Sequence, residues 1–202
     1  VYLHAHKLMR KTWKGMPTRQ DVHTARWNEV ADHVNSNYYF IDMERYTLDH
    51  VLKKGAELVK RKGIKCLVID PFNKVRDMAG NLSDVNQYTL EYLQKIETFC
   101  KKYDVLVIVV AHPTKMYKGQ DGKIEEPTMY NIKGGGEWYD ASYHGLLIHR
   151  DYDNNTVKAK VLKVKFQNLG QNQAEAHFTW DPRSGCYSPS AAPAADGKMP
   201  WD

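Results

Sequence analysis

The chain has 202 residues, which is room for one domain or for two very small ones. Hydrophobic residues make up 42% of the sequence and aromatic residues 11%, so the chain can bury a core and wholesale disorder is excluded. The net charge of +5 arises entirely within residues 1–20, which hold five basic side chains and no acidic one. A uniformly basic nucleic-acid-binding surface is therefore excluded.

The cysteine pattern and the apolar runs bear on the compartment. Cys66, Cys100 and Cys186 form no CxxC pair, which argues against a disulfide framework or a zinc site and favours a reducing compartment. The longest purely apolar run, Val105–Ala111, falls well short of the roughly 20 residues of a membrane span, so no membrane contact is expected. The chain starts with Val and without a secretory signal pattern, which suggests a fragment of a longer protein.

The first sixty residues predict two helices with a short strand between them. Thr18, with Asp21 three residues later, predicts a cap that opens the first amphipathic helix. Residues 38–41 are apolar and predict a strand. Thr47 predicts the N-cap of the second helix, whose basic last turn and following Gly63 are typical C-terminal signals.

Two continuous apolar runs, residues 66–69 and 105–111, predict strands that are buried on both faces of a parallel sheet. Residues 83–103 between them predict a long helix, and the three elements form a right-handed βαβ unit. The strands end at Asp70 and His112. Because ligands of such sheets bind at the carboxyl ends of the strands, we expect both side chains at a functional edge.

The remainder of the chain is more polar. Residues 114–136 are rich in glycine and charge and predict a mobile loop. Further strands are expected at residues 145–149, 156–166 and 176–180. Residues from 188 onward are of low complexity and predict disorder, so we expect one domain, residues 1–187, and a disordered tail, residues 188–202.

Asp70 and His112 each admit two interpretations. A carboxylate directly after buried aliphatic residues suits the water shell of Mg²⁺ in a nucleoside triphosphatase, but an aspartate that ends a parallel strand is at least as often a cap. A histidine at the end of the neighbouring strand can contact a terminal phosphate or serve the structure alone. The residues by themselves leave both alternatives open.

Four lysines without intervening acids occupy the strand expected near residue 160: Lys158, Lys160, Lys163 and Lys165. Their spacing changes parity after the second lysine, so the two pairs cannot share a face of a regular strand. They either form a solvated edge that resists aggregation, or Lys163 and Lys165 project at phosphate as point charges.

A glycine run offers a second candidate for anion binding. Lys133 precedes Gly134, Gly135 and Gly136, whose backbone N–H groups can converge on an anion. The spacing GxxxxGK[ST] of a phosphate-binding loop occurs nowhere in the sequence. The chain by itself therefore contains no P-loop.

Taken in order, four segments resemble the motifs of DnaB-type, RecA-fold ring helicases. Residues 67–73 (LVIDPFN) resemble the Walker B strand, in the Asp-Pro-aromatic-Asn version of phage primase–helicases and Twinkle-like helicases. Residues 107–115 resemble the next motif, in which His and Pro follow the strand. Residues 134–143 resemble the glycine-led motif, and residues 162–166 resemble the basic strand that carries the trans-acting finger. The resemblance covers roughly residues 38–187.

Two positions depart from the family pattern. The family usually has Asp where Tyr143 stands and commonly has Arg where Lys165 stands. The second replacement keeps the charge but loses the planar fork that binds phosphate bidentately. The family's Walker A loop and catalytic Glu lie upstream of these motifs, and the resemblance places both before Val1.

The resemblance implies a RecA-like α/β core with a mostly parallel central sheet flanked by helices, incomplete at its N-terminal side. It implies the C-terminal part of a hexameric, NTP-dependent replicative helicase that moves along single-stranded DNA and unwinds duplex. ATP or another NTP and Mg²⁺ would be its cofactors, a primase domain or protein a partner, and the cytoplasm of a bacterial or phage-infected cell its location. The alternative is a non-catalytic RecA-fold module for DNA binding or assembly. A recombinase or clock-type relative fits less well, because the Asp-Pro-Phe-Asn and His-Pro segments point elsewhere.

The resemblance also implies roles for single residues. Asp70 would hold Mg²⁺ through water, Asn73 would support that loop and bind nucleotide, and His112 would sense the terminal phosphate. Lys163 and Lys165 would reach the nucleotide of a neighbouring subunit, so that catalysis is shared across the ring interface. The residues expected to face the DNA backbone are Arg76, Lys115, Lys133, Gly134 and Gly135.

Overall fold

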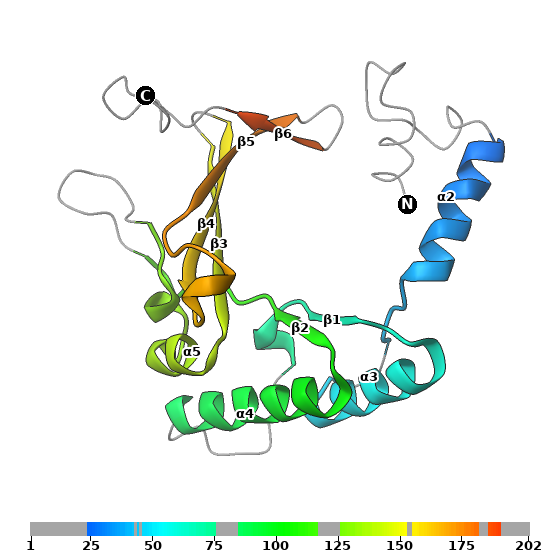
Figure 1. Cartoon of the computed structure of the whole chain (residues 1–202), viewed down its shortest axis with the longest axis horizontal. Coiled ribbons are helices and arrows are strands. Elements are labelled where there is room, and N and C mark those ends of the chain that lie inside the picture. The colour runs from blue at the N-terminus through cyan, green and yellow to red at the C-terminus, as the bar shows by residue number, and fades with distance from the viewer. Residues whose placement is uncertain are drawn as a thin grey trace. The chain divides into compact units, whose positions relative to one another are not determined.

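The computed structural model describes residues 24–42, 44, 46–75, 85–116, 126–152, 155–181 and 186–190. The chain divides into two compact units, one formed by Ile41–Leu147 with Lys160–Ala174, the other by Val1–Phe40, Ile148–Ala159 and Glu175–Asp202. The first unit contains α3 (Leu48–Lys62), β1 (Cys66–Ile69), η1 (Phe72–Lys74), α4 (Val85–Tyr103), β2 (Leu106–Val109), η2 (Met129–Asn131), α5 (Gly135–Ala141) and η3 (Gln167–Leu169) (Figure 1). The second contains α2 (Thr24–Asn37), β5 (Glu175–Asp181) and β6 (Cys186–Ser190), while β3 (His144–Asp151) and β4 (Thr156–Val164) contribute residues to both.

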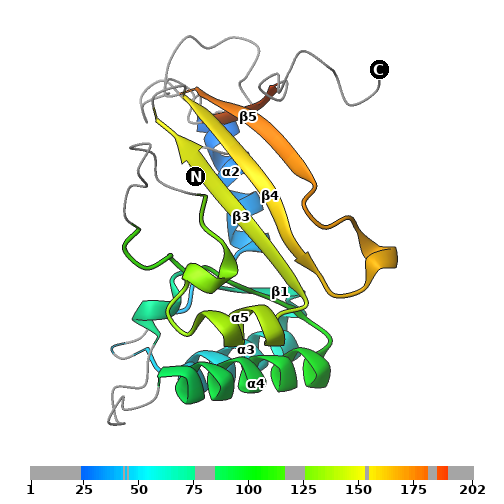
Figure 2. The same ribbon diagram turned by 90° about the vertical axis from the view of Figure 1, so that its left-hand side faces the viewer.

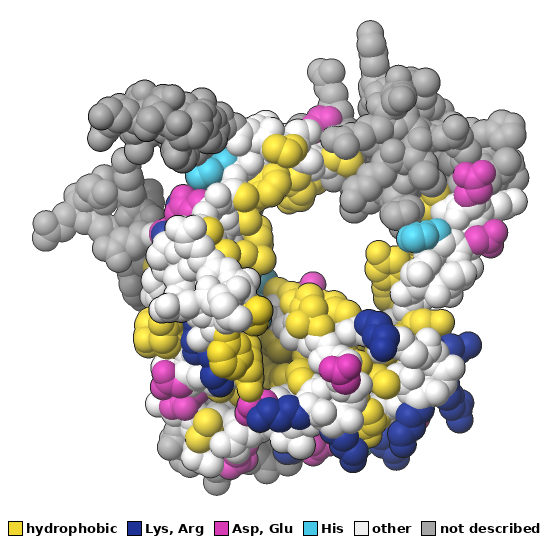
Figure 3. All heavy atoms as spheres, in the orientation of Figure 1, with side chains coloured by type: hydrophobic (Ala, Val, Ile, Leu, Met, Phe, Trp, Pro, Cys, Tyr) yellow, Lys and Arg dark blue, Asp and Glu magenta, His cyan; other side chains and the backbone are white. Residues whose placement is uncertain are grey.

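Helix α3 begins and ends at the predicted signals. Thr47 is the N-cap, and its Oγ1 accepts a hydrogen bond from the backbone N–H of His50 at 3.2 Å. Gly63 adopts the left-handed conformation with φ 65° and donates its N–H to the carbonyl of Val59. The basic side chains of this helix gather on the surface over α3 (Figure 3). Both caps were readable because each is a local interaction within one turn.

Strands β1 and β2 pair in parallel, in register from Cys66 opposite Leu106 to Ile69 opposite Val109. Helix α4 connects them, which confirms the predicted βαβ unit. Helices α3 and α4 lie side by side against the strand pair in both views (Figures 1 and 2). This arrangement places the core of the first unit between the two helices and one face of the strands.

The expected burial of both strand faces is wrong for the part of the chain that the structure describes. Leu67 and Ile69 are 5% and 2% exposed, whereas Val68, Leu106 and Ile108 are 56%, 57% and 44% exposed. Successive side chains of a strand point to opposite faces, and α3 and α4 cover only one of them. Apolar runs thus located the strands correctly but did not reveal which elements cover each face.

Residues 38–41 form no strand, so that prediction is also wrong. Tyr38 donates its backbone N–H to the carbonyl of Val34 and so closes the last turn of α2. Tyr38 and Phe40 are 55% and 85% exposed. A segment forms a strand only when its backbone hydrogen-bonds to a neighbouring strand, and no described strand lies next to residues 38–41. The predicted cap at Thr18 and Asp21 lies outside the described residues.

The second sheet has the strand order β3-β4-β5-β6. Strands β5 and β6 pair antiparallel, from Asp181 opposite Cys186 to His177 opposite Ser190. The connections between consecutive strands are too short for parallel crossovers. The α/β class is confirmed, but the described strands contain more antiparallel pairing than the mostly parallel sheet that was expected. Strand β6 also includes residues 188–190, the start of the expected tail, while residues 191–202 lie outside the described part.

The segment expected to be a mobile loop, residues 114–136, contains ordered structure over residues 126–136. Thr128 and Asn131 form a capping box around η2, in which the Thr128 backbone N–H donates to Asn131 Oδ1 at 2.7 Å. Helix α5 then begins at Gly135 and lies along α4 (Figure 2). Glycine content suggested mobility here, but the glycines allow close helix packing instead.

Gly134 is the residue on which the close approach of α5 to α4 depends. Its φ of 83° is left-handed, and a Cβ at this position would overlap the buried Oγ1 of Thr89 on α4.

Among the described residues, no helix is both long and apolar enough to cross a membrane.

We expect Gly134→Ala to lower the free energy of unfolding by about 1–3 kcal/mol, because the side chain is strained by the positive φ and collides with Thr89. Gly136→Ala is the matched control, since a Cβ there meets nothing within 4 Å and alanine favours the helix by up to about 1 kcal/mol. Urea denaturation of both variants measures the difference. Equal effects would contradict the packing role of Gly134.

Candidate active site

The carboxyl ends of β1 and β2 meet at one edge of the parallel pair. Beyond the last register pair, Val110 donates its N–H to the carbonyl of Ile69 at 2.9 Å, and Phe72 donates to the carbonyl of Val110 at 2.8 Å. Asp70 directly follows β1 and His112 follows the end of β2, and both are exposed. The structure therefore places these two predicted site residues at the same sheet edge.

Phe72 fixes the loop that follows Asp70. Its side chain is 9% exposed and meets the rings of Tyr92 on α4 and Trp138 on α5 edge-to-face, with centroid distances of 4.8 and 4.9 Å. Such pairs contribute about 0.5–1.5 kcal/mol each beyond the burial of their surface. Asn73 follows in η1 with an exposed side chain. The two predicted nucleotide-site residues Asp70 and Asn73 thus flank a buried aromatic anchor.

The aromatic cluster around Phe72 was not predicted, because Phe72 and Trp138 entered the sequence motifs only as separate letters. Burial raises the pKa of the Tyr92 hydroxyl, and the nearby Tyr88 adds to that rise. The ring of Tyr92 therefore takes part in this cluster as an uncharged aromatic group. The sequence shows only that residues 72, 92 and 138 are aromatic, and this does not reveal which rings contact one another in the fold.

The segment after His112 is tied to η2. Pro113 forms a backbone bridge with Ile132, and Thr114 donates its N–H to the carbonyl of Asn131 at 2.7 Å. Trp138 Nε1 donates to the carbonyl of Lys133 at 3.2 Å. The loop that carries Lys133 is consequently held both by the end of β2 and by the helix that packs on Phe72.

The residues predicted to face DNA have different environments. The side chains of Lys115 and Lys133 are exposed, whereas Gly134 and Gly135 are packed against Thr89 and against the backbone of Tyr130. The described contacts thus give the two glycines packing roles. Their contact with DNA stays a prediction, and Arg76 lies outside the described residues.

Lys163 contacts the C-terminal end of α5. Its ammonium donates to the carbonyls of Tyr139 and Asp140, the latter at 3.3 Å, and lies 4.7 Å from the centroid of the Tyr139 ring. A cation is favoured at this end of a helix, where carbonyls lack intrahelical partners. Burial lowers the pKa of Lys163, while the Asp140 carboxylate opposes that shift. The catalytic role of Lys163 stays a prediction beside this structural one.

Lys165 is more exposed than Lys163. Its backbone N–H donates to the carbonyl of Tyr143 at 2.9 Å, and its ammonium lies 4.1 Å from the centroid of the Tyr143 ring. The other two lysines of β4 pair with acids: Lys158 with Glu175 at 3.6 Å and Lys160 with Glu126 at 2.9 Å. These partners are distant in sequence, so lysine spacing alone did not identify them.

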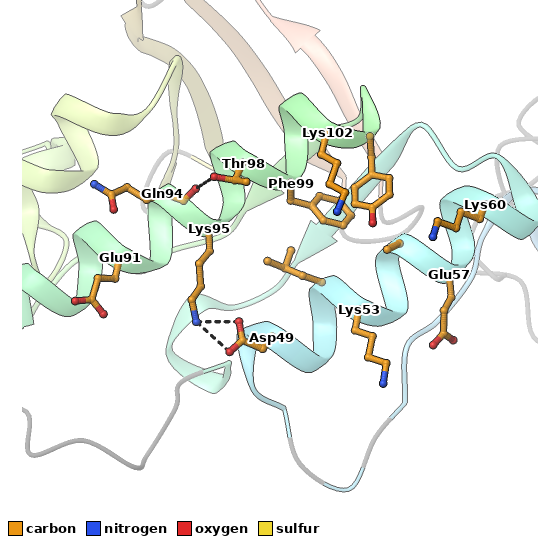
Figure 4. A pocket seen from close by; sticks show the side chains of 13 residues that line it. Asp49, Lys53, Glu57, Lys60, Glu91, Gln94, Lys95, Thr98, Phe99 and Lys102 are labelled. Atoms are coloured by element: carbon orange, nitrogen blue, oxygen red, sulfur yellow. Dashed lines mark hydrogen bonds and ion pairs between the residues drawn. The ribbon is translucent and has the colours of Figure 1, made fainter.

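A groove of about 950 Å³ runs between α3 and α4, and Asp49 and Lys95 form an ion pair of 2.8 Å across it (Figure 4). None of the predicted site residues lines this groove. Within the described residues, no group of three or more His, Cys, Asp and Glu side chains gathers as a metal cluster.

Comparison with solved structures identifies the fold. The chain matches a solved ATPase domain with a TM-score of 0.67 and 17% identity, over 92% of this chain and 67% of that one. It matches a DnaB-like replicative helicase, solved in a study of its interactions with primase, with a TM-score of 0.67 and 15% identity, over 92% of this chain and 45% of that one. The fold is therefore the RecA-like fold of DnaB-type helicase ATPase domains.

Sequence comparison adds a relative within this class. The chain is 30% identical over 165 residues to the Twinkle homolog protein, chloroplastic/mitochondrial, of Arabidopsis thaliana. The match covers 78% of this chain and 23% of that protein, so the chain spans about a quarter of the length of its curated relative. No protein-family model matches the sequence. The resemblance to DnaB-type and Twinkle-like helicases is thus confirmed.

We expect Lys163→Met to lower the free energy of unfolding by about 1 kcal/mol, because it removes a charged donor from the last carbonyls of α5. Lys165→Met, the matched control two residues away, replaces an exposed ammonium over the Tyr143 ring by a thioether that also contacts aromatic rings favourably, so it should change stability by no more than about 0.5 kcal/mol. Urea denaturation of the two variants gives both values. A larger loss of stability in Lys165→Met than in Lys163→Met would contradict the stabilising role of Lys163 at the end of α5.

Proposed function

We propose that this chain is part of a ring-forming, NTP-dependent replicative DNA helicase and supplies its Walker B aspartate and its trans-acting basic strand. One observation carries the proposal: Asp70 and His112 stand at the shared carboxyl edge of parallel strands, in a sequence related to a Twinkle homolog. Ligands of open α/β sheets bind at this edge. The order of the four motifs supports the same assignment.

The donor set at the sheet edge suits Mg²⁺. Asp70 offers a carboxylate and Asn73 an amide oxygen, both exposed, and Mg²⁺ prefers oxygen ligands while keeping several waters. Asp70 would hold the ion through water, and Asn73 would support the loop. When bound, Mg²⁺ neutralises charge on the phosphates of ATP or another NTP.

His112 is the proposed sensor of the terminal phosphate. The backbone that follows it reaches the Lys133 loop through Pro113 and Thr114, which bond to Ile132 and Asn131. A shift of the strand end on hydrolysis would therefore move a loop that carries an exposed lysine. This path supports coupling between nucleotide and single-stranded DNA, with Lys133, Lys115 and Arg76 as contacts to backbone phosphates.

Lys165 is the proposed trans-acting finger, with Lys163 beside it. A finger stabilises the charge of the transferring phosphoryl group from a neighbouring subunit, which requires the chains to form a ring. A hexamer is the assembly that the motif resemblance implies. A primase partner is supported only by the DnaB-like helicase whose interactions with primase were solved.

The compartment also belongs to the proposal. The cysteine pattern favours a reducing, cytoplasmic location for this chain, whereas the name of the plant relative places that protein in chloroplasts and mitochondria. A cytoplasmic location in a bacterial or phage-infected cell stays a prediction.

A non-catalytic DNA-binding or assembly module is the competing function. It is favoured by one observation, the two departures from the family pattern at Tyr143 and Lys165, which would then be relics of a lost activity. The helicase proposal requires that a GxxxxGK[ST] loop be supplied by other residues of the complete protein. The two functions therefore differ in whether the complete protein hydrolyses NTP.

In the complete protein, Asp70→Asn should lower single-stranded-DNA-stimulated NTP hydrolysis at least about a hundredfold, because the site loses a charge that holds Mg²⁺. Asp104→Asn is the matched control, since Asp104 is exposed with φ 52°, a conformation that Asn adopts readily. Phosphate release measures both variants.

The 202-residue chain alone should show no measurable hydrolysis, because it contains no P-loop. Absence of hydrolysis by the complete protein would favour the non-catalytic module. Robust magnesium-dependent turnover by the isolated chain would contradict the proposal that residues outside this chain supply the phosphate-binding loop.

A further inference from the structure

Lys165 is held by one residue through both its backbone and its side chain. It directly follows β4, donates its backbone N–H to the carbonyl of Tyr143, and places its ammonium 4.1 Å from the Tyr143 ring centroid. An exposed lysine otherwise samples many rotamers, and ordering its side chain costs conformational entropy. The ring thus narrows the positions that this ammonium occupies.

The ring of Tyr143 is itself held from α4. Its hydroxyl donates to Oε1 of Glu97 at 3.0 Å, and the ammonium of Lys101 pairs with the same carboxylate at 2.8 Å. The hydrogen bond from Lys101, followed by that from Tyr143, lowers the pKa of Glu97. The carboxylate is therefore charged at neutral pH and accepts from both groups.

The charges around Lys165 favour the same position. The Glu97 carboxylate attracts the Lys165 ammonium, and this attraction is the smallest of the causes that lower the pKa of Glu97. Lys163, held on the carbonyls of α5, repels Lys165. The centroid of the Phe166 ring lies 6.0 Å from that of the Tyr143 ring.

We propose that Tyr143 is a positioning residue for Lys165, and that Glu97 orients the Tyr143 ring. This inference rests on the proposed role of Lys165 as the trans-acting finger. An aromatic face attracts a cation without neutralising its charge. The ammonium is thereby ordered yet remains able to bind a phosphate of the neighbouring subunit. Lysine needs this help more than arginine does, because its flexible stem loses more freedom for each contact formed.

The test uses steady-state NTP hydrolysis by the complete protein, assembled on saturating single-stranded DNA. Lys165→Ala should lower kcat at least about a hundredfold and leave KM nearly unchanged. Tyr143→Leu should lower kcat about tenfold with KM within about twofold, and Tyr143→Phe, which keeps the ring but loses its hydrogen bond to Glu97, should lower kcat about threefold. In the Lys165→Ala background, Tyr143→Leu should cause no further loss, because Tyr143 acts only through the lysine.

Two results separate this inference from the proposed function. Wild-type turnover by Lys165→Ala overturns the finger itself. If Lys165→Ala is inactive while Tyr143→Leu turns over normally, or if Tyr143→Leu slows the Lys165→Ala protein further, the positioning role is overturned and the finger stands.

A second variant keeps the test decisive if Tyr143→Leu fails to assemble. Glu97→Gln changes a side chain that is 36% exposed and removes the negative charge that strengthens the hydrogen bond from the Tyr143 hydroxyl, so kcat should fall about threefold only when Lys165 is present. Glu91→Gln, at an exposed acid on the same helix, is the control and should leave kcat unchanged. An equal kcat for Glu97→Gln and the wild type overturns the proposed orientation of Tyr143.

Discussion

The edge-to-face packing of Phe72 on Tyr92 and Trp138 is the contact on which the candidate site depends. Phe72 belongs to the loop after β1, Tyr92 to α4 and Trp138 to α5. A single buried ring therefore sets the position of the Asp70 loop relative to two helices. Because cores are close-packed, a shift of this ring would displace all three elements together.

Two further contacts connect this aromatic cluster and the end of β2 to the loop that carries Lys133. Trp138 holds the carbonyl of Lys133. The end of β2 reaches the same loop through Pro113 and Ile132. Both strand ends that carry candidate nucleotide residues thus connect to the start of α5. Lys163 caps the other end of that helix, and the chain then passes through Tyr143, which contacts Lys165. Helix α5 accordingly links the proposed nucleotide edge with the proposed finger.

Local signals made much of this fold predictable. Thr47 and Gly63 cap α3 as expected because each acts within one turn, and the strand of residues 66–69 was correct to the residue, whereas the apolar run of residues 105–111 is longer than the strand Leu106–Val109 that it contains. The shared edge of Asp70 and His112 followed from the βαβ rule alone. These features depend on neighbours in sequence or on a general rule of topology.

Long-range contacts accounted for the errors and omissions. Val68 is exposed because no described element packs on its face of the strand pair. The pairing of Lys160 with Glu126 depends on folded geometry, as does the seating of Lys163 on α5. Glycine content around Gly134 was interpreted as mobility because the sequence does not reveal that Thr89 packs against it. A side chain's partner across the fold was therefore the least predictable property of the site.

A double-mutant cycle on Phe72 and Trp138 tests the central claim that this contact couples the Asp70 loop to α5. The free energy of unfolding is measured by urea denaturation for the wild type, Phe72→Leu, Trp138→Leu and the double variant. The account predicts a coupling energy of about 0.5–1.5 kcal/mol between the two rings. Effects that add to within about 0.3 kcal/mol would show that the two elements are stabilised independently, and would contradict it.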